Sequence, residues 1–167
     1  VAKLADQLGI PADDAKILIQ QHRDKVPFVK GLADLATKQA SDNGQIRTLL
    51  GRKCRFHLWE PVTFGVGKPL PHDEAQKEYG KQIRRAFTYK ALNRLIQGSA
   101  ADQTKKAMLD CYNEGLIPML TVHDELCFNI ENDEQIGRIK EIMETGVPLK
   151  VPSKIDVDIK PDWGEVE

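Results

Sequence analysis

The chain has 167 residues, of which 41% are hydrophobic and 29% are charged, a composition that supports a packed core and excludes wholesale disorder. Its length suits one compact domain or two small lobes. No apolar run approaches the roughly 20 residues that a membrane-spanning helix needs, and no basic-then-apolar leader opens the chain. The first residue is Val1 and the sequence after it has a mid-domain character, so we expect a piece of a longer protein.

Cysteine and histidine are too scattered to form a structural framework. Cys54, Cys111 and Cys127 are widely spaced with no CxxC pair, and the four histidines are equally dispersed. This pattern predicts neither a disulfide scaffold nor a structural zinc site. A reducing, cytoplasmic setting fits it best.

The formal net charge of −1 conceals an uneven distribution. Residues 1–43 hold 6 basic and 6 acidic residues, residues 44–110 hold 13 and 6, and residues 111–167 hold 5 and 13. The basic middle suits a polyanion such as a nucleic-acid backbone, and the acidic end could repel that backbone or hold metal ions against it. Two differently charged, solvated faces would give the same pattern.

The first quarter of the chain has the periodicity of a small helical lobe. A short helix over 3–8 ends at Gly9, and a second helix begins near Asp13 and Asp14, whose charges favour a helix N-terminus. Pro27 opens a third helix, which stops at the Ser-Asp-Asn-Gly run of 41–44. We find no catalytic constellation in this lobe.

The middle of the chain changes to other patterns. Alternating residues and Gly51 predict a basic hairpin over 45–56, and the prolines and glycines of 57–75 predict a loop. A long helix, broken or bent once, is expected from about 74 to 113.

The last third carries the clearest strand signal. Residues 116–130 predict two strands joined by a polar tip, followed by a helix over about 133–144 and a last strand over 155–159. Together these elements predict an α+β fold with an antiparallel sheet packed on long helices.

The polar tip consists of His123, Asp124 and Glu125. Burying three ionisable residues between apolar strands is costly unless they emerge at the surface or bind something. A carboxylate at a strand-to-strand corner is a good ligand for Mg²⁺, which takes one or two such groups together with substrate phosphates. Because aspartate is common in turns, an ordinary polar hairpin turn explains the same residues.

Asn93 and Gln97 are four apart and share one face of the expected helix. Their amides can donate to the acceptors that the DNA minor groove presents at every correct base pair. An amide pair satisfied by neighbouring backbone is the alternative interpretation.

Both signals fall on segments that match one family. ALNRLIQGSAAD, residues 91–102, resembles the long palm helix of family A DNA polymerases, the bacterial DNA polymerase I type and its phage relatives. TVHDELCF, residues 121–128, is similar to their carboxylate-bearing hairpin, and RTLLGRKCRF, residues 47–56, to their basic hairpin. The closing DVDIKPDW resembles their C-terminal strand and tryptophan, so the match covers most of the chain after about residue 44 in the right order.

The resemblance implies a role for each matched residue. Asp124 would be one of two metal-binding aspartates, Glu125 would support the primer terminus and the metal, and His123 would contact the primer strand. Asn93 and Gln97 would line the minor-groove side of the newest base pairs. Arg52 and Lys53 would touch nucleic-acid backbone. Where some relatives carry an arginine one turn before the asparagine, this chain has Tyr89, and the nearby cations Arg85, Lys90 and Arg94 are the possible substitutes.

Two family motifs have no counterpart in the chain. Nothing matches the upstream DYSxxE motif, which carries the other aspartate, or the RxxxKxxxFGxxYG helix, whose cations would hold the incoming triphosphate. We therefore expect the end of the fingers subdomain over 1–43 and the second half of the palm over 44–167. Such a chain would bind primer–template DNA, deoxynucleoside triphosphates and the remaining polymerase portion, and would be inactive alone.

Two other functions fit the same residues. The chain could be a duplex DNA-binding module without catalysis, in which case removing Asp124 would leave duplex affinity unchanged. It could also be a small metal-dependent phosphodiester hydrolase centred on residues 123–125, although no second histidine or carboxylate cluster lies nearby in the sequence. In the polymerase interpretation it acts in the cytoplasm of a bacterium or an infected host cell.

Overall fold

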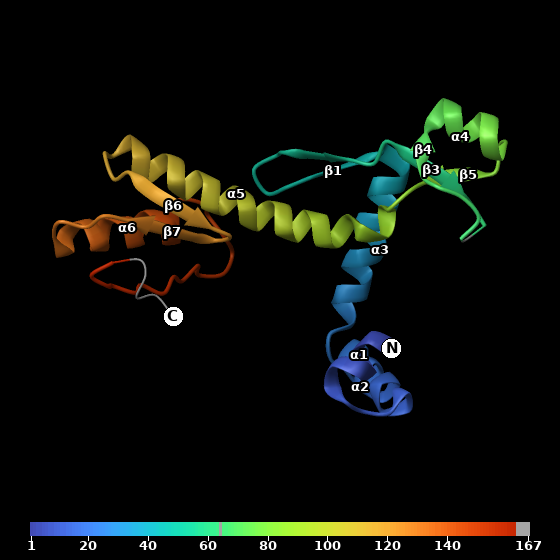
Figure 1. Cartoon of the computed structure of the whole chain (residues 1–167), viewed down its shortest axis with the longest axis horizontal. Coiled ribbons are helices and arrows are strands. Elements are labelled where there is room, and N and C mark those ends of the chain that lie inside the picture. Colours follow the sequence, from blue (N-terminus) through green and yellow to red (C-terminus); the bar gives the residue numbers. More distant parts are fainter. Residues whose placement is uncertain (64, 163–167) are drawn as a thin grey trace. The chain divides into compact units, whose positions relative to one another are not determined.

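The computed structural model describes residues 1–63 and 65–162. The chain divides into two compact units, Val1–Ile96 and Gln97–Glu167, and the border falls within helix α5 (Ala91–Asn113). Each unit combines helices with antiparallel strands (Figure 1), which confirms the predicted α+β class. Within the described residues, no helix has the length and apolarity to cross a membrane.

Three helices open the first unit. Helix α1 spans Ala2–Leu8, α2 spans Ala12–Lys25 and α3 spans Pro27–Asn43. Gly9 and Gly44, at the ends of α1 and α3, have left-handed backbones with φ of 63° and 66°, a conformation that glycine adopts without steric cost. Pro27 occupies the first turn of α3, where its missing N–H is not needed. The predicted helical lobe is therefore confirmed.

A hairpin follows, as the sequence predicts. Strand β1 (Gln45–Arg47) pairs antiparallel with β2 (Lys53–Arg55), and Ile46 lies opposite Cys54. The Ile46 side chain is 1% exposed and belongs to the main core of this unit. The other buried members of that core are Ala36, Ala40, Phe56 and Ala91.

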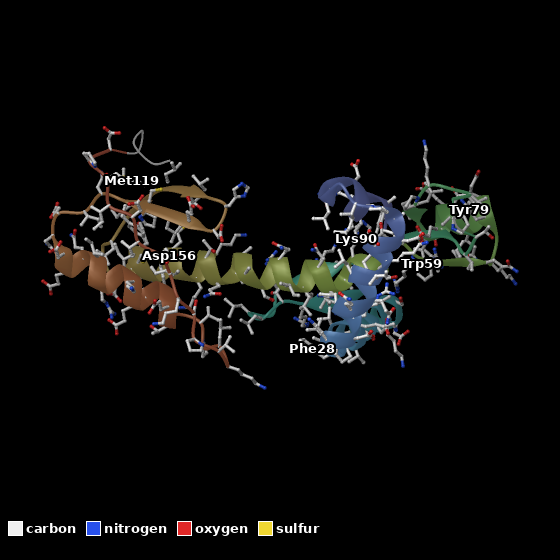
Figure 2. All side chains as sticks on the ribbon, turned by 90° about the horizontal axis from the view of Figure 1, so that it is seen from below. Phe28, Trp59, Tyr79, Lys90, Met119 and Asp156 are labelled. Atoms are coloured by element: carbon white, nitrogen blue, oxygen red, sulfur yellow. The ribbon has the colours of Figure 1, made fainter. Side chains whose placement is uncertain are left out.

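The structure corrects the prediction for residues 57–90. In place of a loop and the first part of a helix broken or bent once there are β3 (Leu58–Pro61), β4 (Leu70–Pro71), α4 (His72–Tyr79), β5 (Ile83–Arg85) and a short 3-10 helix, η1 (Thr88–Lys90). The three strands form a sheet in the order β4-β3-β5. Trp59 and Tyr79 lie in this lobe (Figure 2).

The expected long helix fails for a physical reason. Gly80 ends α4 with φ 74° and ψ −155°, which lies outside the helical region. The residues after it then pair with β3, with Ile83 opposite Pro61 and Arg85 opposite Trp59. Sheet pairing between residues that are distant in the chain overrides the local helical preference, and a local pattern cannot show it.

Arg85 links this lobe to the helices and the hairpin. Its Nε donates to the Ser41 carbonyl at 3.0 Å and its Nη1 donates to the Phe56 carbonyl at 3.1 Å. The guanidinium also lies over the Trp59 ring, 4.6 Å from the centroid. One half-buried cation thus joins the end of α3, the end of the hairpin and β3.

The second unit contains the part of helix α5 from Gln97 onward, a two-stranded hairpin and α6 (Asp133–Thr145). The hairpin pairs β6 (Pro118–Val122) with β7 (Glu125–Phe128) in antiparallel register. Asn132 caps α6 by accepting a hydrogen bond from the Gln135 backbone N–H. The core of the unit consists of Cys111, Ile139 and Ile142, with Leu116, Phe128 and Met143 packed against it. The structure confirms both the predicted hairpin and the predicted helix.

Two expectations for this unit are wrong. The apolar run predicts that β6 is buried on its flanks, but Met119 is 63% exposed (Figure 2). The expected strand over 155–159 is absent, and residues 146–162 form no helix or strand. A strand needs a hydrogen-bonded neighbour, and alternation in the sequence does not show whether one exists. Trp163, the tryptophan of the tail resemblance, lies outside the described residues.

Arg138 on α6 joins two carboxylates at the surface of this unit. It donates to Glu114 from Nε and Nη2, both at 2.6 Å, and to Glu141 from Nη1 at 2.6 Å. The hydrogen bonds from Arg138 lower the pKa of Glu114. A carboxyl group whose pKa is lower in the folded state contributes stability above its unfolded pKa and loses it as the pH falls through the folded pKa.

Arg138→Ala should therefore raise the pKa of Glu114 and remove the stabilisation that this group contributes above its unfolded pKa, so that the variant loses less stability as the pH falls through the acid range. Carbon-13 NMR titration of the carboxyl groups measures the change. Lys154→Ala is the matched control, because a hydrogen bond from Lys154 lowers the pKa of Glu144 in the same unit. Each variant should raise the pKa of its own partner carboxyl group only. A Glu114 pKa that is the same in Arg138→Ala as in the parent chain would contradict the ion pair between Arg138 and Glu114.

Candidate nucleic-acid interface and carboxylate hairpin

The β6–β7 hairpin presents its ionisable residues at a tight turn. Val122 pairs with Glu125, so His123 and Asp124 form a two-residue loop. His123 has φ 54°, a left-handed conformation that such loops usually assign to glycine or asparagine. A side chain in this region costs on the order of 1 kcal/mol or more. His123, Asp124 and Glu125 are all exposed, so the turn holds one imidazole and two carboxylates in solvent.

One side chain of this hairpin has the chemistry of a magnesium ligand. An exposed carboxylate on a short turn supplies the hard oxygen that Mg²⁺ prefers, and Asp124 meets that description. Within residues 1–63 and 65–162, however, no group of three or more histidine, cysteine or acidic side chains could hold a metal ion. Among these residues Asp124 would therefore be at most one ligand of such an ion.

Asn93 and Gln97 lie on helix α5, as predicted, and both are exposed. Asn93 belongs to the first unit and Gln97 is the first residue of the second. Exposure is what a groove contact requires, and the predicted minor-groove role of the two amides stays a prediction.

The cations near Tyr89 differ in what they contact. Arg85 is committed to the backbone bonds described above, and Arg94 lies over the Phe56 ring at 4.9 Å. Lys90 is exposed, with its Nζ 5.0 Å from the Phe87 ring centroid and 5.6 Å from that of Tyr89. Lys90 is thus the most exposed of the three cations, a ranking that the sequence could not provide.

The β1–β2 hairpin carries Arg52 and Lys53, the residues predicted to contact the nucleic-acid backbone, and both are exposed. The structure adds two residues that sequence reasoning missed. Leu49 and Leu50 form the tip of the hairpin and are 50% and 49% exposed. Alternation in the sequence groups Leu50 with the strand residues, but β1 ends at Arg47. The signal that could have found them is the order Thr-Leu-Leu-Gly, which places two leucines directly before a turn glycine.

Comparison with known proteins first defines the class. The solved structure of the POL domain of Pol1 from M. smegmatis, in complex with DNA primer-template and dNTP, superposes with a TM-score of 0.64 at 30% sequence identity. The match covers 89% of this chain and 25% of that one. The fold is therefore that of part of a polymerase domain.

Sequence comparison then gives the family. The model for DNA polymerase family A matches residues 1–165, and the chain belongs to that family. It is 38% identical to the DNA-directed DNA polymerase of Pseudomonas phage M6 over 98% of this chain and 22% of that protein. It is 30% identical to the thermostable DNA polymerase I of Thermus aquaticus over 96% of this chain and 18% of that protein. The chain thus spans about a fifth of the length of these relatives.

Proposed function

We propose that the chain is the C-terminal segment of a DNA-directed DNA polymerase and takes part in template-directed nucleotidyl transfer during DNA replication. The observation that carries this proposal is the exposed Asp124 carboxylate on the two-residue turn of β6–β7, within a chain that matches the family over residues 1–165. The alternatives, a binding module without catalysis and a small hydrolase, lack a comparable observation.

Asp124 would hold magnesium through its carboxylate, together with a second aspartate from another segment, in a two-metal site. When bound, magnesium stabilises the charge on the attacking and leaving oxygens of phosphoryl transfer. Glu125, the first residue of β7, would support the primer terminus. His123, whose left-handed backbone fixes the turn, would contact the primer strand near its end.

DNA binding would fall to other elements. Asn93 and Gln97 on α5 would donate to the minor-groove acceptors that correct base pairs share. Arg52 and Lys53 on the β1–β2 hairpin would contact phosphates, which fix position without reading sequence. The M. smegmatis complex contains primer-template DNA and dNTP, which supports DNA and deoxynucleoside triphosphates as the partners of this chain.

In this proposal residues 1–43 end the fingers subdomain and residues 44–167 form the second half of the palm. The remaining polymerase portion would supply the second aspartate and the cations that hold the triphosphate. The chain alone would therefore not extend a primer. Its place of action would be the cytoplasm of a bacterium or an infected host cell.

The test is primer extension on a primed template with magnesium and all four deoxynucleoside triphosphates. The chain is assayed alone, and mixed with an N-terminal fragment of a family A polymerase that ends at its nucleotide-binding helix. That fragment alone is the control. Extension in the mixture only is the expected result. Extension by the pure chain would contradict its incompleteness. No extension in any arm, with tight and metal-independent duplex binding, would favour the binding module.

A further inference from the structure

The β1–β2 hairpin concentrates positive charge around an apolar tip. Residues 45–56 contain Arg47, Arg52, Lys53 and Arg55 and no acidic residue. All four cations are exposed. Figure 1 shows the hairpin projecting from the end of α3. Such a surface is complementary to a polyanion.

Hydrogen bonds hold the tip itself. The Gly51 N–H donates to the Thr48 carbonyl at 2.9 Å, which makes Leu49 and Leu50 the two central residues of a β-turn. Thr48 and Arg52 exchange three further bonds: Thr48 N–H to the Arg52 carbonyl at 2.9 Å, Arg52 N–H to Thr48 Oγ1 at 3.0 Å, and Thr48 Oγ1 to the Arg52 carbonyl at 3.3 Å. Arg47 Nη1 donates to the Gly51 carbonyl at 3.1 Å.

These bonds give the tip a fixed shape, with the Thr48 side chain 6% exposed. The two leucines stand at the outermost point of that turn and leave about half of their surface in solvent. A turn of this kind ordinarily carries polar residues. Two leucines at the centre of the turn therefore place an apolar surface beside the four cations of the hairpin, which are suited to hold a nucleic acid.

We propose that Leu49 and Leu50 form an apolar wedge that enters between base steps of duplex DNA, while the four surrounding cations hold the phosphates on either side. Proteins that bend DNA insert leucine and similar side chains in this way and partly unstack the step. The rigid turn lowers the ordering cost of insertion. The inference rests on the proposed function for its partner, and it adds a local distortion of the duplex that the function does not require.

The experiment uses the full chain and a series of primer–templates with 2-aminopurine at each template position in turn. The fluorescence of this base rises when it loses its stacking partner. Three paired variants are compared: Leu49→Ala with Leu50→Ala, Arg52→Gln with Lys53→Gln, and Leu32→Ala with Leu35→Ala. The last pair removes two exposed leucines from α3 and is the matched control. Circular dichroism checks that each variant is folded.

The parent chain should raise the fluorescence at one or two adjacent positions. The tip variant should lose that rise in fluorescence. It should also bind duplex about tenfold more weakly, a modest loss because the free energy gained by burying the two side chains is partly offset by the cost of unstacking. The dependence of its affinity on salt should match that of the parent. The cation variant should lower the slope of log affinity against log salt by about 1 for each phosphate that the variant no longer neutralises. The α3 variant should behave as the parent.

Four results would overturn the wedge. If the chain binds duplex without any fluorescence rise, or if the tip variant gives the same rise as the parent, the leucines do not enter the base stack. The proposed DNA contacts of the other residues would be unaffected by either result. If the tip variant lowers extension in the mixed assay with an unchanged rise, the tip packs against the rest of the polymerase. Absence of all duplex binding would overturn both the wedge and the proposed DNA contacts.

Discussion

Asp124→Asn should reduce primer extension by the mixed enzyme about a thousandfold or more, because a metal ligand contributes several kcal/mol of charge stabilisation and each 1.36 kcal/mol is tenfold in rate. The substitution keeps the size of the side chain, removes the negative charge and replaces one acceptor oxygen by an NH2 donor. Asp124 is exposed at the turn, so the change should leave the fold intact. The rate of single-nucleotide incorporation at saturating substrate measures the effect.

The matched control is Asp133→Asn, which removes an exposed carboxylate from the first turn of α6 in the same unit. It should retain the parent rate. Duplex affinity should be nearly equal in all three proteins, which separates loss of the metal ligand from loss of DNA. An Asp124→Asn mixture that incorporates nucleotide at the rate of the Asp133→Asn mixture would remove Asp124 from the metal site.

Local signals predicted those elements that local residues determine. Gly9, Pro27 and Gly44 fix the ends of the first helices through backbone conformation alone, and a glycine or proline is visible in a sequence. The two hairpins were also predictable, because their strands are adjacent in the chain and joined by short turns.

Elements that depend on distant partners were not predictable. The sheet β4-β3-β5 forms between residues 58 and 85, and nothing within residues 81–85 alone shows that they pair with β3. The same limit applies to Arg85. Its bonds to Ser41 and Phe56 join residues 44 and 29 positions apart, so its role as a structural link is invisible in the sequence.

The candidate site shows the same division. His123, Asp124 and Glu125 are contiguous, so a motif could place them together at a turn, as the structure does. The left-handed backbone of His123 and the exposure of the hairpin tip at Leu49 and Leu50 were not visible. Both depend on exact turn geometry, in which one residue more or less reverses the side that a residue faces.

Ile46→Ala should destabilise the first unit by about 2–5 kcal/mol, the usual cost of truncating a fully buried isoleucine. Ile46 is 1% exposed and is the residue of β1 that enters the core beside Phe56. Its loss should therefore loosen the hairpin that carries Arg52 and Lys53. Ile17→Ala, which truncates a side chain 55% exposed on α2, should change stability by about 0.5 kcal/mol or less.

Urea unfolding measures both variants, with Trp59 as the probe for the first unit. The chain has two tryptophans, so a Trp163→Phe background makes Trp59 the sole reporter. Trp59 stacks on the same Arg85 that bonds the Phe56 carbonyl, and its fluorescence should follow loss of the core that Ile46 fills. The midpoint for Ile46→Ala should fall with little change in slope, since the surface exposed on unfolding is nearly unchanged. Equal midpoints for the two variants would show that the hairpin is held by its ladder and by Arg85, and that Ile46 contributes little to the core.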